Sequence, residues 1–498
     1  MNRIITGMLI ACLFFPAISK AQNEIDALRY SQSYYGSTAR SLAMGGAFGA
    51  LGGDFSSLSM NPAGLGVYRS SELSISAGSI SRVTKSKFQG NSTSENKFNI
   101  TLGNLGLVLA KTNSNRDANW KQFSLAFGHN RINDLGVESY YEGMNFNNSI
   151  TDFFSQAVNL DGGATPSELA TYYPFDANLA YQTFLIDPSA TVSGYYESII
   201  PSGNVQQSRT FSSKGSQGEF SIAMGANYQN KFTLGLSFAF PNIKYEEESI
   251  YEERDVDNTV INADSSADFK SLRYTQLLTT SANGFNLKFG MIYRVTDGIR
   301  IGASIHSPTW YNMSDKYRSS IQSIVNNISY SETSPDGAYS YKLNTPFKFI
   351  GSIAFIFGKK GILSIDYEYN DYTTMKLKAN DYSFSNENQT INNIYTKNGH
   401  SLRAGAEFNL KPFLFRLGVA YYGSPFNTTL DMDDFDQQVQ SFSGGIGYRI
   451  NSIRFDIGYS YSQRNDIYTA YTLINQTVPS VINKRIDHRV MMTLGLRF

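Results

Sequence analysis

Residues 220–240 read Phe-Ser-Ile-Ala-Met-Gly-Ala-Asn-Tyr-Gln-Asn-Lys-Phe-Thr-Leu-Gly-Leu-Ser-Phe-Ala-Phe. Apolar residues occupy every second place on both sides of Gln229-Asn230, and asparagine is common in tight turns. Successive side chains of a strand point to opposite faces, so the stretch predicts two strands that each have one apolar face. The segment therefore indicates a β-hairpin.

The same period of two recurs from about residue 70 to the C-terminus. Tight turns join alternate strands: Gln229-Asn230, Thr296–Gly298, Gly358–Gly361, Lys411-Pro412 and Asn451-Ser452. Longer polar connections lie between them, through residues 241–280, 306–340, 370–398, 423–440 and 462–484. This alternation of short and long connections is typical of bacterial outer-membrane barrels. We therefore predict an all-β fold over residues 70–498, an antiparallel transmembrane β-barrel of about 14 strands.

The composition agrees with a barrel. The chain has 33 Tyr, 34 Phe and 41 Gly against 2 Trp, and its mean hydropathy is −0.29. Beyond residue 21 no run of about 18 apolar residues could form a membrane-spanning helix. Strands with one apolar face keep the average hydropathy low. The alternative is a soluble β-rich protein, which alternating strands alone would also fit.

Several classes of function lack their signatures. The 42 basic residues balance the 42 acidic ones, so no net positive charge favours nucleic-acid binding. The 4 His have no close His or Cys neighbour in the sequence, so we predict no metal site and no cofactor. No nucleophile elbow or phosphate-binding loop is visible, so we predict no catalytic residue and no enzymatic activity.

The N-terminus has the features of an export signal. Arg3 precedes an apolar stretch from Ile4 to Ile18, and Ser19-Lys20-Ala21 supplies small residues for cleavage. We predict a signal peptide over residues 1–21, removed in a mature protein of the Gram-negative outer membrane. The alternative is an uncleaved anchor.

The C-terminal strand predicts a partner for assembly. Apolar residues occupy every second place from Val490 to the terminal aromatic residue Phe498. This arrangement resembles the signal that the bacterial barrel-assembly machinery reads, where an incoming strand would add to an open sheet edge. The other predicted partner is the lipid of the outer membrane.

The connection over residues 133–216 is much longer than a hairpin loop and is predicted to lie outside the cell. It carries an apolar cluster that includes Phe153, Phe154, Tyr172, Tyr173, Phe175 and Phe184. Ile150, Phe153, Phe154 and Val158 would share one side of a short amphipathic helix. The cluster predicts a hydrophobic groove for a ligand. The alternative is that these rings only pack the loop on itself.

Residues 36–66 contain a more specific pattern. Its parts are Ala39-Arg40, Met44-Gly45-Gly46-Ala47, Asp54 and Asn61-Pro62-Ala63-Gly64-Leu65. The segment resembles the N-terminal hatch of the FadL/OmpP1/TodX family, especially its Bacteroidetes-type members, which are often labelled hemin receptors. The resemblance implies a 14-stranded barrel whose lumen is plugged by a hatch over residues 22–69. It makes Gly45, Gly46, Asn61, Pro62 and Ala63 candidates for a gate. The alternative is that Asn61-Pro62-Ala63 merely bends the chain into the first strand.

The resemblance also implies a function. Members of the family take up long-chain fatty acids, aromatic hydrocarbons or similar compounds by diffusion, with capture on outer loops and release past the hatch. A kink in the third strand opens a side route to the membrane, and Gly128-His129 interrupts the predicted third strand here. The alternatives are a docking role in protein secretion, known for some similar barrels, and hemin binding. A transporter needs an apolar path for its ligand, which a docking barrel does not.

Overall fold

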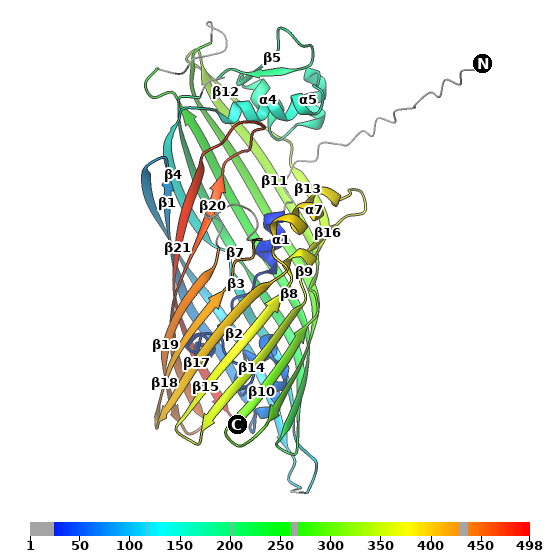
Figure 1. Cartoon of the computed structure of the whole chain (residues 1–498), viewed down its shortest axis with the longest axis vertical. Coiled ribbons are helices and arrows are strands. Elements are labelled where there is room, and N and C mark those ends of the chain that lie inside the picture. The colour runs from blue at the N-terminus through cyan, green and yellow to red at the C-terminus, as the bar shows by residue number, and fades with distance from the viewer. Residues whose placement is uncertain (1–23, 116, 201–202, 259, 261–266, 428–436) are drawn as a thin grey trace, which may run out of the picture.

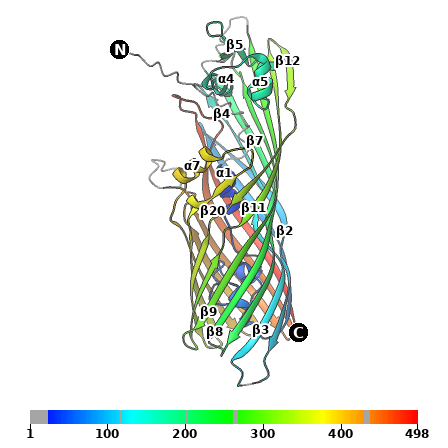
Figure 2. The ribbon, with the colours of Figure 1, turned by 90° about the vertical axis from the view of Figure 1, so that its right-hand side faces the viewer.

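A computed structural model describes residues 24–115, 117–200, 203–258, 260, 267–427 and 437–498 (Figures 1 and 2). The predicted signal peptide, residues 1–21, lies outside the described residues. Within the part of the chain that is described, no helix is both long and apolar enough to cross a membrane.

The described strands form a closed antiparallel barrel of 14 strands, as predicted. The barrel closes because the first strand pairs with the last. In order around the wall the strands are β1 (Glu72–Phe88), β2 (Asn91–Thr112), β3 (Trp120–Asp134) continued by β4 (Val137–Asn145), β7 (Val205–Tyr228), β8 (Phe232–Arg254), β9 (Phe269–Arg294), β10 (Ile299–His306) continued by β11 (Trp310–Val325), β14 (Lys348–Phe357) with β13 (Gly337–Asn344), β15 (Gly361–Asn370) with β16 (Lys376–Lys378), β17 (Gly399–Leu410), β18 (Phe413–Tyr422), β19 (Val439–Ile450), β20 (Ile453–Thr469) and β21 (Ser480–Arg497). β12 (Ile328–Thr333) forms a hairpin on β11.

The wall is much taller than a membrane requires on one side. Along β8 the outward residues are apolar from Phe232 to Phe240 and then become Asn242, Lys244, Glu246 and Glu248. The apolar part measures about 27 Å at the usual rise per residue, and the strand continues for about another 45 Å. β17, β18 and β19 end well below that level (Figure 1).

The sequence prediction of connections over 241–280, 306–340 and 462–484 was therefore wrong for most of their residues, and in the second of these β11, β12 and the start of β13 replace the expected loop. Residues 241–254, 269–280, 462–469 and 480–484 all lie in strands. The period of two persists there, but polar side chains replace the apolar outward ones. The signal of an apolar face is lost at that point, although the strand itself continues.

The N-terminal segment fills the lumen and forms the predicted hatch. It contains α1 (Glu24–Ser31), α2 (Ala39–Ala43), α3 (Ser57–Met60) and the 3-10 helix η1 (Pro62–Val67). Figure 1 shows these blue elements inside the barrel, with α1 above the others. α1 packs against α7 (Ser385–Ile394), and the Tyr395 hydroxyl donates to the Glu24 carbonyl at 2.9 Å. The short helix η2 (Tyr372–Thr374) belongs to the same region.

Helices cover the barrel at the end opposite the short turns (Figures 1 and 2). Residues 146–200, called the cap, hold α4 (Ile150–Leu160), α5 (Pro166–Tyr172), α6 (Ala177–Gln182) and the small strands β5 (Ile186–Pro188) and β6 (Tyr196–Ser198). The connection predicted over 133–216 is shorter than expected, because its first residues belong to β4 and its last residues belong to β7. Buried side chains of the cap pack against both β11 and the β20–β21 connection, so the cap bridges the mouth.

A buried carboxylate fastens the cap to the wall. Glu253 on β8 accepts hydrogen bonds from the Ile150 backbone N–H at 2.9 Å and from Gln207 Nε2 at 2.9 Å. Tyr251 donates to it at 2.8 Å, and the Ser149 hydroxyl also donates to it. Glu253 thus holds the first turn of α4 at a height far above the apolar band. Burial raises the pKa of Glu253 to about 7.

This pKa predicts a pH-dependent cap. Between the ordinary pKa of about 4.5 and about 7, the docked state binds more protons than the undocked one, so docking weakens as pH rises through that window. We expect protease cleavage of the cap in isolated outer membranes to be faster at pH 8 than at pH 5. Glu253→Gln should flatten the dependence, whereas Glu197→Gln at an exposed site should not. Equal cleavage of the unmodified protein at both pH values would contradict this.

Candidate transport pathway

Charged side chains of the hatch and of the wall form one continuous buried network. Arg40 of the hatch makes a bidentate pair with Glu407 on β17, at 2.8 and 3.0 Å. Glu407 also accepts from Arg416 at 2.7 Å, and Arg416 pairs with Asp456 at 2.8 Å. The network thus runs from α2 of the hatch across β17 and β18 to β20.

The network then returns to the hatch. Arg454 on β20 lies 2.9 Å from Asp456, 3.3 Å from Glu72 and 3.6 Å from Asp54 of the hatch. Glu72 also pairs with Arg497 at 2.7 Å. Four arginines thus meet four acids, and the cluster is neutral.

Neutrality lets these charges remain buried. A lone charge removed from water is unfavourable by several kcal/mol, and removing one partner of a buried pair typically destabilises by about 3–5 kcal/mol. The two hatch charges, Arg40 and Asp54, are therefore anchors that fix the hatch against β17, β18 and β20. Both belong to the pattern quoted from the sequence, but their wall partners were not predicted.

We expect Arg40→Gln to loosen the hatch, because Glu407 then keeps one cation instead of two. In planar lipid bilayers the variant should show larger and more frequent ion-conducting openings than the unmodified protein. Arg318→Gln is the matched control, since Arg318 pairs with Asp336 on the exposed surface. Conductance of Arg40→Gln equal to that of the control would contradict an anchoring role.

The predicted gate residues lie against glycines of the wall. Asn61 accepts from the Ala63 N–H at 3.1 Å and donates to the carbonyls of Gly49 at 2.6 Å and Met291 at 3.2 Å. A Cβ on Gly290 of β9 would overlap the Asn61 side-chain oxygen. The hatch thus approaches the strand backbone closely, and Asn61 holds the turn that starts η1.

A similar approach occurs on β8 and β18. A Cβ on Gly235 would overlap the backbone of Pro62 and Ala63. Gly45 and Gly46 have φ values of +61° and +75°, a region that favours glycine, and Gly45 lies against the backbone of Val419. The five predicted gate residues therefore act as close-packed contacts in this state. The hydrogen bond from Asn61 to the Gly49 carbonyl links the Asn61-Pro62-Ala63 turn to the segment that follows Gly45 and Gly46.

Gly290→Ala should displace Asn61 and lower the thermal stability of the folded barrel, because the added methyl overlaps the hatch. We expect its heat-modifiable band on gels to unfold at a lower temperature. Gly444→Ala on β19 is the control, since the nearest atom to its Cβ is 3.5 Å away. If both substitutions lowered the unfolding temperature equally, the loss of a glycine from a strand, and not the contact with the hatch, would determine the stability.

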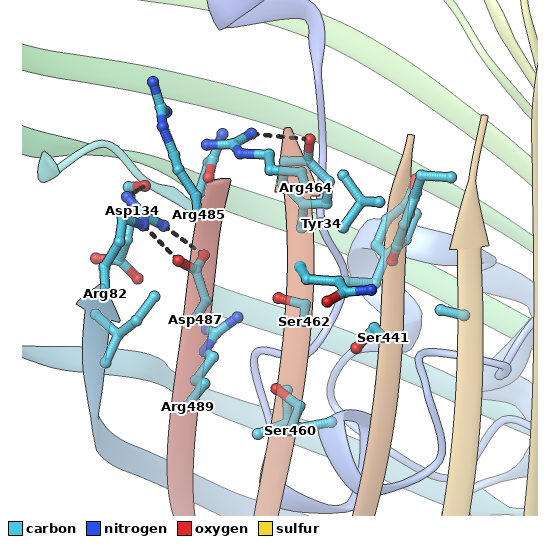
Figure 3. Close-up of a pocket in the computed structure, with 18 of the residues that line it drawn as sticks. Tyr34, Arg82, Asp134, Ser441, Ser460, Ser462, Arg464, Arg485, Asp487 and Arg489 are labelled. Atoms are coloured by element: carbon cyan, nitrogen blue, oxygen red, sulfur yellow. Dashed lines mark hydrogen bonds and ion pairs between the residues drawn. The ribbon is translucent and has the colours of Figure 1, made fainter. Parts of the chain in front are cut away.

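A cavity lies in the lumen beside the hatch (Figure 3). The space free of protein atoms is about 820 Å³, and part of it is open to solvent. Leu42 and Gly45 of the hatch form part of its lining. Ile132 and Asp134, at the end of β3, border it on the wall. A second, polar cavity shares Tyr35 and Ile132 with the first.

The wall beside this cavity lacks backbone pairing along one line. The ladder between β2 and β3 runs from Thr112 and Gln122 to Asn104 and Asn130 and stops there. β2 continues to Asn91 paired with β1 alone, while β3 and β4 stay paired with β7. We call the line between residues 91–103 and 131–142 the seam.

Side chains close the seam in this state. Lys97 pairs with Glu138 at 2.6 Å, and the Thr101 hydroxyl donates to Asp134 at 3.4 Å. Ile100, next to them on β2, is 83% exposed and faces outward. Phe98 and Leu102, the neighbouring outward residues of β2, are also apolar and exposed. The lower part of the seam therefore lies within the apolar band of the wall.

The irregularity in the third strand lies beyond the predicted position. Gly128 and His129 are paired on both sides, so the expected interruption at these residues was wrong. The register instead shifts between Arg131 and Asn133, and β3 ends at Asp134. Gly128 has another role: it lies opposite Gly106, and Phe55 of the hatch packs on both.

The predicted ligand-binding rings of the cap mostly contact one another or the rim of the barrel. Phe153 lies 5.8 Å from Phe154, measured between ring centroids, and Phe154 is fully buried. Three rings of the cap contact tyrosines of the barrel rim: Phe154 contacts Tyr274, Phe175 contacts Tyr317, and Phe184 contacts Tyr330. The Tyr173 hydroxyl donates to Asp161, and Tyr172, the last residue of α5, is partly buried. These contacts favour the alternative in which the rings pack the cap. The helix predicted around Ile150 to Val158 is present as α4.

Comparison with known proteins agrees with this geometry. A sequence model of the family described as outer membrane protein transport protein (OMPP1/FadL/TodX) matches residues 205–483, more than half of the chain. The match starts at β7, so it is independent of the hatch pattern. A search of curated proteins finds no match.

Solved structures share the fold. The toluene transporter TodX of P. putida superposes with a TM-score of 0.55 at 12% identity, over 93% of this chain and 98% of that chain. A FadL homologue from Pseudomonas aeruginosa gives a TM-score of 0.53 at 12% identity, over 94% and 98%. At such identities the likeness concerns architecture alone.

Proposed function

Because the chain belongs to the OMPP1/FadL/TodX family of outer membrane transport proteins, we propose that it admits hydrophobic small molecules by passive diffusion. Long-chain fatty acids and monoaromatic hydrocarbons are the compounds to consider, since one structural relative is described as a toluene transporter and another as a FadL homologue. The ligand would first meet the cap, where Phe146, Leu160 and Phe184 expose apolar surface.

The seam beside a lumen cavity is the observation that carries this proposal. Opening the wall between β1 and β2, or between β3 and β7, would break backbone hydrogen bonds between the strands. At the seam it requires the rotation of side chains: Lys97, Thr101 and Arg131 make contacts of 2.6 to 3.5 Å across it. Nearer its upper end, Thr93 and Asn91 donate to the backbone carbonyls of Tyr140 and Glu142. A ligand in the cavity next to Ile132 could therefore pass sideways into the membrane, where Ile100 and Phe98 offer apolar contact.

The hatch favours this side route over release straight through the barrel. Removing the hatch would separate Arg40 and Asp54 from their wall partners, at a cost of several kcal/mol for each buried pair. It would also expose the packed glycine contacts at Gly235 and Gly290. Movement of the hatch, if required, is then a local shift around Gly45 and Gly46 that leaves the ion pairs intact.

The C-terminal strand β21 is the element that we expect the barrel-assembly machinery to bind. In the finished barrel β21 pairs along its length with β1, so its edge is free only before closure. The strand that ends at Phe498 is thus available to the barrel-assembly machinery during insertion and not afterwards. A docking role in protein secretion would need neither the cavity nor the seam, and we regard it as the alternative outcome of the transport test.

The proposal predicts uptake and a side exit. A Gram-negative host without its own channel of this family should take up labelled oleate or toluene several-fold faster when it produces this protein. A photoactivatable fatty acid should label a benzophenone side chain at Ile100, beside the seam, more than one at Leu417, an exposed apolar position on β18.

Two results would contradict the proposal. Uptake no faster than that of host cells without the protein would argue against transport and favour docking. Equal labelling at Ile100 and Leu417, despite rapid uptake, would remove the side exit and leave release past the hatch.

A further inference from the structure

Two lysines face each other on the outer surface where the barrel closes. Lys85 on β1 lies directly opposite Lys484 on β21, and Lys87 follows two residues further along β1. All three side chains are exposed. Their neighbours Ser86 and Asn483 are buried on the inner face, where Ser86 donates to Asn483 at 2.7 Å, so the lysines point outward. We call Lys85, Lys87 and Lys484 the lysine cluster, and Figure 1 shows their strands β1 and β21 side by side.

No acidic side chain compensates the lysine cluster. In the row of Lys85 and Lys484, the outward residue of β20 is Asn465 and that of β2 is Ser94. Among the described residues, none of the three lysines forms a hydrogen bond or an ion pair. Lys214 on β7, by contrast, pairs across the strands with Glu246 at 2.7 Å. Like charges directly opposite each other destabilise a strand pair, so an external anion would stabilise this part of the wall.

The lysine cluster lies at the upper edge of the apolar band. On β21 the outward residues from Leu496 to Ile486 are apolar except His488, whose ring contacts Tyr461. At the usual rise and tilt of barrel strands, this stretch has a height of about 26 Å, which matches the apolar band of an outer-membrane barrel. Lys484 is the next outward residue after Ile486. It therefore lies at the level of the lipid headgroups, on the side away from the short turns.

We propose that the lysine cluster binds a phosphate group of lipopolysaccharide, the phosphorylated glycolipid of the outer leaflet, whose acyl chains then lie along the apolar band. This lipid carries its phosphates on the sugars next to the acyl chains, which is the level of the cluster. A phosphate accepts charge-assisted hydrogen bonds from ammonium groups. Its negative charge removes the repulsion between Lys85 and Lys484. Ser94 and Asn465, in the same row, supply further donors.

The surface below the lysine cluster suits a lipid rather than a dissolved anion. Val83 and Ile486 form the next outward row, and Phe98 and Ile100 on β2 are exposed and apolar. A dissolved phosphate would contact the lysines alone, whereas a lipid would also cover this apolar surface and gain the free energy of removing it from water. The wall separates the cluster from the lumen cavity, so the inference goes beyond transport and does not depend on it.

Native mass spectrometry of the full chain in detergent micelles tests the site, with diphosphoryl lipid A and phosphatidylglycerol as probes and inorganic phosphate as a competitor. We expect lipid A to bind roughly tenfold more tightly than phosphatidylglycerol, because it offers two phosphates. Lys85→Gln/Lys484→Gln should weaken lipid A binding roughly tenfold. Lys359→Gln/Lys360→Gln, which removes two exposed charges from a short turn at the opposite membrane face, should bind lipid A like the unmodified protein. Heat-modifiable migration on gels confirms that each variant is folded.

Several results would overturn the inference. Undiminished lipid A binding by Lys85→Gln/Lys484→Gln would remove the cluster from the site. An equal loss in Lys359→Gln/Lys360→Gln would reduce the effect to overall charge, since both double variants lose two positive charges and differ only in position. Equal affinity for phosphatidylglycerol would indicate a surface for any anionic lipid, and displacement of lipid A by inorganic phosphate would indicate a site for a dissolved anion.

Discussion

Charges buried between the hatch and the wall must be paired, because an isolated charge removed from water is unfavourable by several kcal/mol. In this protein Arg40 and Asp54 enter the lumen on the hatch, and the wall supplies Glu407 and Arg454 to meet them. The whole cluster is neutral, so it holds the hatch firmly without leaving a charge for a passing ligand. The position of every other lumen feature depends on this attachment.

A fixed hatch divides the lumen. Around Asn61 and Pro62 the hatch packs closely on strand glycines and leaves little space, whereas a cavity remains between Leu42 and Gly45 of the hatch and the end of β3. Along the seam β2 keeps its backbone pairing with β1 and loses its pairing with β3, while β3 and β4 keep theirs with β7. A cavity with a fixed floor and a side wall closed by side chains alone is suited to sideways release.

The tall side of the wall carries the cap at the end of the barrel where the ligand would enter. β7, β8 and β9 continue beyond the apolar band with polar outward residues, which suits them to water or to the sugar-rich outer leaflet surface. Their far ends carry the cap, and Glu253 ties its first helix to β8. The aromatic side chains of the cap mainly hold it together and to the rim. Ligand capture there would use the rings that remain exposed, such as Phe184, rather than buried ones such as Phe154.

The sequence by itself determined the strands, the turns between them and the presence of a hatch. Alternation such as that from Phe220 to Phe240 is a local property, because the period of side chains along a strand does not depend on which strand lies beside it. The hatch pattern around Arg40 and Asn61 could be recognised for a related reason, since its glycines and its Asn-Pro turn lie within one short segment of the chain. Tertiary structure alone decided which residues meet. Glu407 and Arg454 lie far along the chain from Arg40, and only the register of β17 to β21 brings them to the hatch. The bend of β3 was misplaced at Gly128 because the shift at Arg131 depends on pairing with β7, which no local pattern records. Likewise, Arg489 is one inward arginine among several until the ladder sets Ile80 and Ser460 beside it.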